Sequence, residues 1–268
     1  MLTIKRQLYS VDTPRVMAII NITPDSFAMS CRSMTEDEVL SAAALALSQG
    51  ADILDIGGCS TRPDSTPIDE AEEWRRVSLA LRVIRSAFPD AVLSVDTFRA
   101  SVAQQAIEQF GADIINDVSG GTEQMWEVVA KHNVPYILTH SRPITHSDGV
   151  CDVLDFLVRQ ADRLHQMGVR DVMIDPGFGF HKTAEQNYHL LAHLHDLTEA
   201  GLPIVVGLSR KSMVYQTLGT TPDSDQTLLG TTALQMTALE QGAAILRVHD
   251  VQAARQTIQL YQTLTNNQ

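Results

Sequence analysis

Polar and charged residues that can bind ligands stand at or just after the ends of short apolar runs, at eight places along the chain. In chain order they are Asn21, Asp55, Asp96, Asn116, His140, Asp175, Lys211, Arg247 and His249. Any one of them could be an ordinary polar loop residue. Together they predict a shared pocket, because Asp, Asn, Arg and His side chains at strand ends are partly buried and need partners.

Within this set, an acceptor group and a cationic group can be told apart. The acceptor group is Asp96, Asn116 and Asp175. The cationic group is Lys211, Arg247 and His249. A carboxylate can accept two parallel hydrogen bonds from a flat, amidine-like edge such as that of a pterin ring, and cationic side chains bind phosphate oxygens. The two groups together suggest a heterocycle that carries a pyrophosphate. No Ser–His–Asp or Cys–His pattern indicates a nucleophilic side chain.

The apolar runs that precede these residues are short and rich in Val, Ile and Leu. They do not alternate with polar residues, which is typical of parallel strands buried on both faces. The predicted strands are Val16–Ile20, Asp52–Ile56, Val92–Val95, Ile114–Ile115, Pro135–Leu138, Val172–Ile174, Ile204–Val206 and Ala244–Val248.

Stretches with helical periodicity lie between these strands. The predicted helices are Glu36–Gln49, Glu70–Ala87, Arg99–Phe110, Gln124–His132, Leu154–Met167, Ala184–Glu199, Leu228–Gly242 and Gln252–Thr265. Thr35 and Glu38 have the spacing of a capping box at the start of the first helix. Glycines stand between helix and strand where a left-handed helix cap costs glycine least. They are Gly50, Gly111, Gly168, Gly201 and Gly242.

Eight strand–helix alternations without a linker predict a single (β/α)₈ TIM-barrel domain over residues 1–268. A doubly wound open sheet is the competing architecture. In such a barrel the active site lies at the C-terminal ends of the strands, which would bring the polar residues to one rim. The opening segment, Leu2–Val11, predicts a short β-hairpin that could cover the floor of the barrel.

Composition narrows the classes of partner. The 268 residues are 44% apolar, which is enough for a sizeable core. The net charge of −12 argues against nucleic acid or an anionic membrane, because both bind positive surfaces. Cys31, Cys59 and Cys151 show no metal or disulfide spacing and are interpreted as reduced thiols. The N-terminus has no long apolar run, so we expect a cytoplasmic protein with neither a signal peptide nor a membrane span.

Motifs along nearly the whole chain, from about Val16 to the C-terminus, resemble those of the dihydropteroate synthases. They are Asn21–Phe27 (NITPDSF), Gly57–Pro63 (GGCSTRP), Ser94–Thr97 (SVDT), Ile115–Asp117 (IND), Asp175–Phe180 (DPGFGF), Gly207–Ser212 (GLSRKS) and Arg247–Asp250 (RVHD). The resemblance implies a barrel enzyme of folate biosynthesis, a transferase that joins the dihydropterin of a pterin pyrophosphate to p-aminobenzoate. In the implied mechanism pyrophosphate leaves the pterin methylene, and the aniline nitrogen attacks the resulting cation.

The resemblance also implies a role for individual residues. It assigns the pterin to Asp96, Asn116, Asp175 and Lys211. It assigns the pyrophosphate to Asn21, Asp55, Arg247 and His249. It assigns p-aminobenzoate to Thr61, Arg62, Pro63, Phe180 and Ser212. The implied catalytic residues are Lys211, Arg247, His249 and Asp96.

A magnesium ion and a homodimer are implied as well. Asn21 would be the protein ligand of Mg²⁺, directly or through water, and an amide oxygen suits this hard cation, which keeps waters and substrate phosphates in its shell. The dimer would form through the last helices. The small-residue stretch Gly230–Ala238 is compatible with such an interface and equally with packing against the barrel.

The chain departs from the family's pattern at three places. Ala28–Cys31 replaces the Ser-Asp-Gly-Gly that commonly follows the first motif, which questions the help that this loop gives to the cation. Cys59 replaces a glutamate, which questions how the second loop is braced. Thr139–Arg142 (THSR) departs from a methionine-flanked histidine, so a functional role for His140 is an open question.

Two rival functions share the pterin-binding residues. One is a pterin-binding methyltransferase domain of the corrinoid type, whose substrate has no pyrophosphate. The retained pyrophosphate motifs count against it. The other is a non-catalytic paralogue that binds pterin without turnover, which the altered first loop makes conceivable. Only a synthase would release pyrophosphate in a p-aminobenzoate-dependent way.

Overall fold

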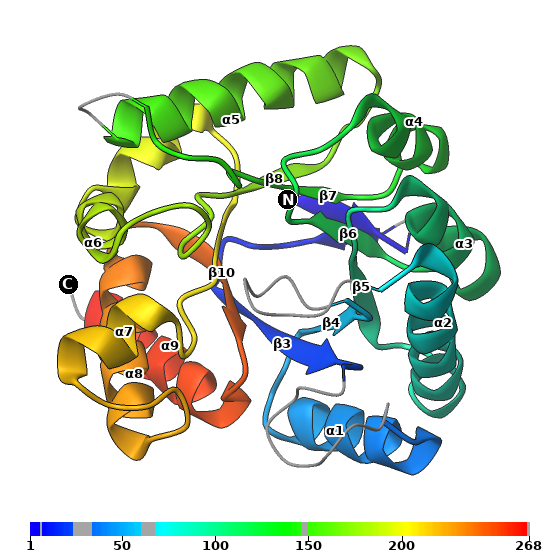
Figure 1. The fold of residues 1–268 in the computed structure, drawn as a ribbon, viewed down its shortest axis with the longest axis horizontal. Coiled ribbons are helices and arrows are strands. Elements are labelled where there is room, and N and C mark those ends of the chain that lie inside the picture. Colours follow the sequence, from blue (N-terminus) through cyan, green and yellow to red (C-terminus); the bar gives the residue numbers. More distant parts are fainter. Residues whose placement is uncertain (6, 24–33, 60–67, 146–148, 267–268) are drawn as a thin grey trace.

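Eight parallel strands close into a barrel in the computed structural model, which describes residues 1–5, 7–23, 34–59, 68–145 and 149–266. The order around the barrel is β10-β3-β4-β5-β6-β7-β8-β9, so the predicted barrel is confirmed and the open sheet is not formed (Figure 1). The strands are β3 (Arg15–Asn21), β4 (Ile53–Gly57), β5 (Val92–Asp96), β6 (Ile114–Asp117), β7 (Tyr136–Thr139), β8 (Val172–Asp175), β9 (Ile204–Val206) and β10 (Ala243–Val248).

Helices connect successive strands and surround the barrel (Figure 1). They are α1 (Glu36–Ser48), α2 (Glu70–Ala87), α3 (Ala100–Phe110), α4 (Glu123–His132), α5 (Gly149–Gln166), α6 (Ala184–Ala192), α7 (Ser212–Leu218), α8 (Asp225–Glu240) and α9 (Val251–Thr265). The predicted capping box is present, because Thr35 and Glu38 each bond the other's backbone N–H. None of the helices in the described ranges is both long and apolar enough to cross a membrane.

The prediction of one helix over Ala184–Glu199 is wrong. The α-helix ends at Ala192, and a 3₁₀ helix, η1 (Leu194–Ala200), follows it. Residues three apart eclipse each other in a 3₁₀ helix, so Leu194 and Leu197 face the same way, and both are fully buried. The short helix α7 was not predicted, because its seven residues are too few to show a helical period.

The N-terminal hairpin is confirmed, with β1 (Leu2–Ile4) antiparallel to β2 (Gln7–Tyr9). Leu2, Ile4 and Val11 pack with the lowest layer of side chains inside the barrel. That layer is Met17, Ile53, Ile114, Ile137, Met173, Val205 and Ile245. The hairpin therefore covers the floor, at the end of the barrel opposite the predicted site.

The position of this layer decides which residues point inward higher up the barrel. Successive side chains of a strand face opposite sides, so positions two and four residues beyond the floor layer also point inward. These positions include Asn21, Asp55, Gly57, Asn116, Thr139, Asp175, Gly207, Arg247 and His249. Apolar packing at the floor thus gives way to a polar interior at the C-terminal strand ends.

Candidate active site

Arg247 links the polar residues of four strands. Its Nε donates to Oδ2 of Asp55 at 2.7 Å, and its Nη2 donates to Oδ2 of Asp96 at 2.5 Å. Asn116 Nδ2 donates to the same Asp55 oxygen at 3.0 Å. Because Asp55 is fully buried and neighbours both side chains, it orients Arg247 and Asn116. A carboxylate repels an anion, so Asp55 would act on a phosphate only through its cationic partner.

The electrostatics of this group favour a ligand that donates hydrogen bonds. Burial raises the pKa of Asp96 to about 7, with Asp55 and Asp175 adding to the rise and Arg247 opposing it. Burial also disfavours the charge of Arg247, but Asp55 and Asp96 outweigh that effect and raise its pKa. The Arg247 side chain therefore stays cationic, whereas Asp96 can hold or release a proton near neutral pH.

Asp175 and Lys211 form the opposite wall. Asp175 Oδ1 accepts from the backbone N–H of Gly177 at 2.7 Å, and burial raises its pKa against the pull of Lys211. The ammonium of Lys211 donates to the Phe178 carbonyl and lies 4.8 Å from the centre of the Phe180 ring. Burial lowers the pKa of Lys211 to about 8, with Asp175 opposing the shift. The wall thus offers an acceptor, a cation and an aromatic face.

Lys182 braces this wall, a role that sequence reasoning missed. Its ammonium donates to the carbonyls of His140 at 2.9 Å, Gly177 at 3.0 Å and Phe180 at 3.3 Å. Gly177 has a φ of +71°, and a Cβ at this residue would stand 2.1 Å from the His140 carbonyl oxygen. The loop after β8 therefore requires glycine there. Lys182 lies two residues beyond the DPGFGF motif, which is the only signal in the sequence for its role.

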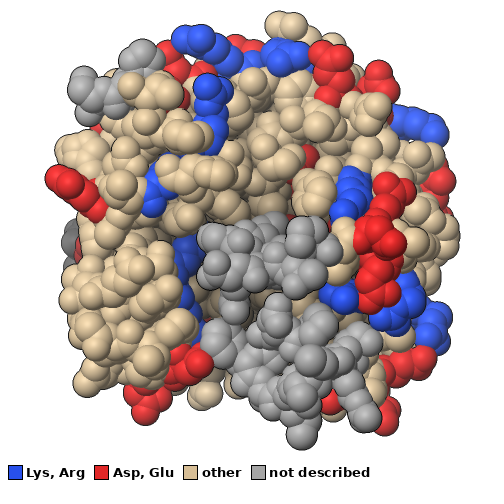
Figure 2. Space-filling model, viewed as in Figure 1, with Lys and Arg blue, Asp and Glu red and all other residues tan. Residues whose placement is uncertain are grey.

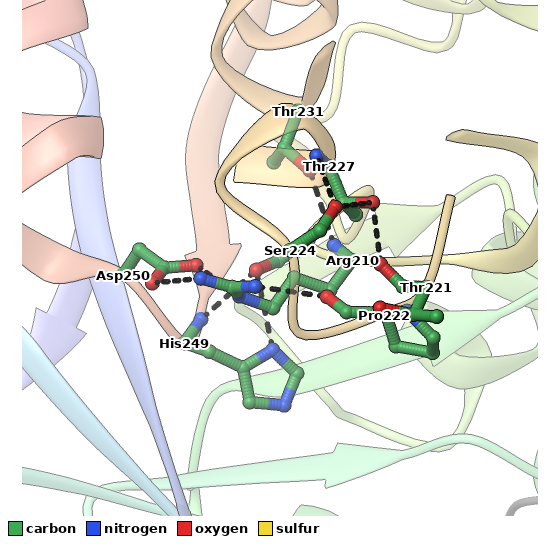
Figure 3. Close-up of polar contacts among 9 residues, drawn as sticks. Arg210, Thr221, Pro222, Ser224, Thr227, Thr231, His249 and Asp250 are labelled. Atoms are coloured by element: carbon green, nitrogen blue, oxygen red, sulfur yellow. Dashed lines mark hydrogen bonds and ion pairs between the residues drawn. The ribbon is translucent and has the colours of Figure 1, made fainter. Parts of the chain in front are cut away.

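The loops after β9 and β10 are joined by Arg210 (Figure 3). Its Nε and Nη2 donate to the two carboxylate oxygens of Asp250 at 2.8 and 2.9 Å, and its Nη1 donates to the Pro222 carbonyl at 2.8 Å. His249 Nδ1 lies 3.2 Å from Ser209 Oγ. Figure 3 shows the guanidinium directed at Asp250 and the imidazole of His249 pointing away from that pair. Arg210 is a brace, and His249 is exposed on the same rim.

Asn21 stands close to Gly57 and Asp96. A Cβ on Gly57 would lie 3.1 Å from Oδ1 of Asn21 and 3.7 Å from Cβ of Asp96, so glycine leaves room for both side chains. The amide oxygen is the kind of ligand that Mg²⁺ accepts. Among the residues whose placement is described, no group of three or more His, Cys, Asp or Glu side chains could hold a metal. The single amide oxygen of Asn21 therefore fits Mg²⁺ if the ion takes most of its ligands from substrate and water.

Glu73 helps to hold the C-terminal end of the second loop, in which Cys59 replaces the family's glutamate. This fully buried carboxylate accepts from Thr97 Oγ1 at 2.5 Å and from Arg99 Nη1. Arg99 Nη2 also donates to the Ile68 carbonyl at 2.6 Å. The described C-terminal end of that loop is therefore tied to the residue next to Asp96. The sequence held no sign of this, because the contacts join separate helices and loops.

Two of the polar residues named from the sequence do not face the interior. The ring of His140 packs edge-on against Phe156 of α5, with 5.1 Å between ring centres, so its placement on the site rim is wrong. Asp117 lies between β6 and the helices, where it accepts from the Tyr136 hydroxyl at 2.9 Å. Strand alternation is the reason in both cases. The inward residue at the end of β7 is Thr139.

The remaining predicted residues are only partly placed. Phe180 lies under Lys211, and Ser212 is the first residue of α7. Outside the described residues lie Thr61, Arg62, Pro63, Ala28, Met29, Ser30 and Cys31. Cys59 and Cys151 form no disulfide within the described parts of the chain. Figure 2 shows Lys and Arg side chains on both sides of the centre of the drawn face, although the net charge of the chain is −12.

The fold and the site define a (β/α)₈-barrel enzyme site for a flat, hydrogen-bonding heterocycle beside cationic groups. The sequence profile of the family described as "Pterin binding enzyme" matches residues 17–249. The dihydropteroate synthase of Haemophilus influenzae is 36% identical over 96% of this chain and 96% of its own. That of Synechocystis sp. is 40% identical over 90% and 86%.

Solved structures agree with these relatives. Yersinia pestis dihydropteroate synthase, in a sulfonamide drug complex, is 36% identical with a TM-score of 0.92 over 99% of each chain. Xanthomonas albilineans dihydropteroate synthase, in complex with 7,8-dihydropteroate, is 36% identical with a TM-score of 0.86 over 96% and 95%. The chain therefore belongs to the family of pterin-binding enzymes that includes these dihydropteroate synthases.

Proposed function

We propose that this chain is a dihydropteroate synthase. It transfers the 7,8-dihydropterin-6-ylmethyl group from its pyrophosphate to p-aminobenzoate, and it releases pyrophosphate and 7,8-dihydropteroate in folate biosynthesis. The observation that carries the proposal is the set of inward acceptors, Asp96, Asn116 and Asp175, gathered beside Arg247 and Lys211. The relatives named above support it, and neither the methyltransferase nor the non-catalytic reading gains support from them.

The pterin binds between the two walls. Asp175 and Asp96 accept hydrogen bonds from the amino group and ring N–H groups, and Asn116 is oriented for the same ligand by Asp55. Lys211, held over the Phe180 ring, donates to the carbonyl side of the heterocycle. Since burial raises the pKa of both carboxyls, a ligand that supplies N–H donors offsets part of their desolvation.

The pyrophosphate lies toward Arg247 and His249. Arg247 donates from Nε to Asp55 and from Nη2 to Asp96. Its Nη1 makes no hydrogen bond to any residue in the described ranges. This donor and the exposed His249 ring are directed to phosphate oxygens. Asn21 would hold Mg²⁺, which would offset negative charge on the pyrophosphate when bound.

The reaction is a substitution at the pterin methylene. The C–O bond breaks with its electron pair going to pyrophosphate, the aniline nitrogen donates its lone pair to form the C–N bond, and its proton is lost to solvent. Arg247 stabilises the charge that develops on the leaving group, and the second substrate is held close to the cation. Phe180 and Ser212 contribute to the p-aminobenzoate end, together with the loop of Thr61, Arg62 and Pro63.

The protein is further proposed to act in the cytoplasm as a homodimer formed through its last helices. Exposed leucines on these helices support the dimer. They are Leu218 of α7, Leu229 of α8, and Leu260 and Leu264 of α9. Burial of such side chains at an interface is favourable because it removes apolar surface from water.

A coupled assay for pyrophosphate release tests the function. With the pterin pyrophosphate and Mg²⁺ present, we expect pyrophosphate to be released only when p-aminobenzoate is added. A methyltransferase-type domain or a non-catalytic paralogue would release none under either condition. Release that does not depend on p-aminobenzoate would mean hydrolysis and would contradict the proposed transfer.

His249→Ala is expected to weaken binding of the pyrophosphate-bearing substrate by about tenfold, the loss of one charge-assisted hydrogen bond. Binding of the pterin alcohol, which lacks phosphate, should not change. Because His249 is exposed, the fold should survive. Calorimetric titration with each ligand measures both affinities, and His195→Ala on the exposed face of η1 is the control. Equal losses for the two ligands would make His249 a structural residue.

A further inference from the structure

The last residue of β7 points into the barrel. Ile137 belongs to the apolar layer at the floor, and Thr139 stands two residues further along the same strand. His140 packs outward against Phe156 of α5. Since side chains alternate along a strand, both neighbours place the Thr139 side chain on the interior surface.

The strand register puts Thr139 beside Asp175. The two residues are Cα partners in the ladder between β7 and β8, just as Ile137 is the partner of Met173. Paired residues on adjacent strands face the same side of a sheet, and such strands lie about 4.8 Å apart. The Thr139 hydroxyl and the Asp175 carboxylate are therefore neighbours on the same wall.

The Thr139 hydroxyl is buried and has no partner in the described parts of the chain. The residue is 0% exposed, and its Oγ1 makes no hydrogen bond there, although its backbone carbonyl accepts from Ser141 at 3.1 Å. A buried hydroxyl without a partner destabilises the fold, whereas valine would fill the same volume without that cost. A ligand that bonds the hydroxyl would remove the penalty.

We propose that Thr139 is a further substrate-binding residue, whose hydroxyl hydrogen-bonds the heterocycle at the edge that Asp175 binds. The inference rests on the proposed function for the identity of the heterocycle, a reduced pterin. A hydroxyl can both donate and accept, so it can complement a ring nitrogen or an N–H group next to those that the carboxylate takes. It adds specificity, because a site built to hydrogen-bond a polar edge discriminates against analogues that lack it.

Thr139→Val tests this, because it removes the hydroxyl and keeps the shape. We expect the affinity for 6-hydroxymethyl-7,8-dihydropterin to fall about fivefold to fiftyfold. The melting temperature without ligand should stay the same or rise, since an unpaired buried hydroxyl is gone. Thr139→Ser should retain most of the affinity. Thr257→Val, which removes a buried hydroxyl from α9 outside the barrel, should leave pterin affinity unchanged.

Two results would overturn the inference. One is a Thr139→Val protein that binds the pterin as tightly as the wild type. The other is a loss of affinity that comes with a lower melting temperature and is not restored by serine, which would make the residue structural. Failure of the proposed reaction would look different: the wild type would bind the pterin and yet release no pyrophosphate with p-aminobenzoate.

Discussion

Arg247→Ala is expected to lower the free energy of unfolding by about 3–5 kcal/mol at neutral pH, because it leaves buried carboxylates without their cation. Asp55 is fully buried and Asp96 nearly so, and both hydrogen-bond Arg247. Binding of the pyrophosphate-bearing substrate should become too weak to measure. Urea unfolding gives the stability, and calorimetric titration gives the affinity.

The loss of stability should depend on pH. Burial raises the pKa of Asp96 to about 7 even though Arg247 lowers it. Without the arginine that pKa rises further. A carboxyl whose folded pKa exceeds its unfolded value of about 4 adds stability below that value and loses it as pH rises through the folded pKa. The destabilisation should therefore be smaller at pH 5 than at pH 8, and a pH-independent loss would contradict the buried ion pair.

One further variant separates the charge of Arg247 from its geometry, and a second is a control at the other end of the barrel. Arg247→Lys keeps the charge but not the planar fork of donors that reaches Asp55 and Asp96 together, so it should recover stability more than substrate affinity. Arg255→Ala removes an arginine that pairs with Asp52 at the other end of the barrel. That pair is partly exposed, so we expect a loss of at most about 1 kcal/mol and unchanged affinity.

Asp175→Asn is expected to weaken pterin binding about tenfold to a hundredfold, because one acceptor oxygen becomes a donor that faces ring N–H groups. The fold should be retained. The amide oxygen can still accept from Gly177 N–H, and burial already disfavours the charge of Asp175. Titration with the pterin alcohol and the melting temperature measure the two effects separately.

The matched control lies at the opposite end of the same strand. Asp171 precedes β8, and its Oδ2 accepts from the backbone N–H of Thr3 in the floor hairpin at 3.0 Å. Asp171→Asn should leave pterin affinity unchanged. If Asp175→Asn binds the pterin as tightly as the wild type, Asp175 is not an acceptor for this ligand.

The sequence by itself was enough to predict the barrel and the end of the barrel at which the candidate site residues gather. Short apolar runs alternate with helical periods, and local periodicity depends only on which neighbours along the chain are apolar. The same local rule placed Asp96, Asn116, Asp175 and Arg247 at strand ends. The hairpin of Leu2–Val11 was predictable for the same reason.

Only the tertiary structure decided which of those side chains meet. Arg247 lies 192 residues from Asp55 and 151 from Asp96 in the sequence, and no local pattern shows that closure of the barrel brings β10 next to β3 and within reach of β4 and β5. The braces formed by Glu73, Lys182 and Arg210 are of the same kind. Each joins segments that are neighbours only because the strands before them are neighbours.

Strand direction and register decided the rest. The run Thr139-His140 contains two polar residues, and the sequence analysis placed His140 at the rim and left its role open. A one-residue change reverses the face of every side chain in a strand, so composition cannot choose between them. Packing of Ile137 at the floor and of His140 on α5 makes the choice, and it leaves Thr139 beside Asp175 inside the barrel.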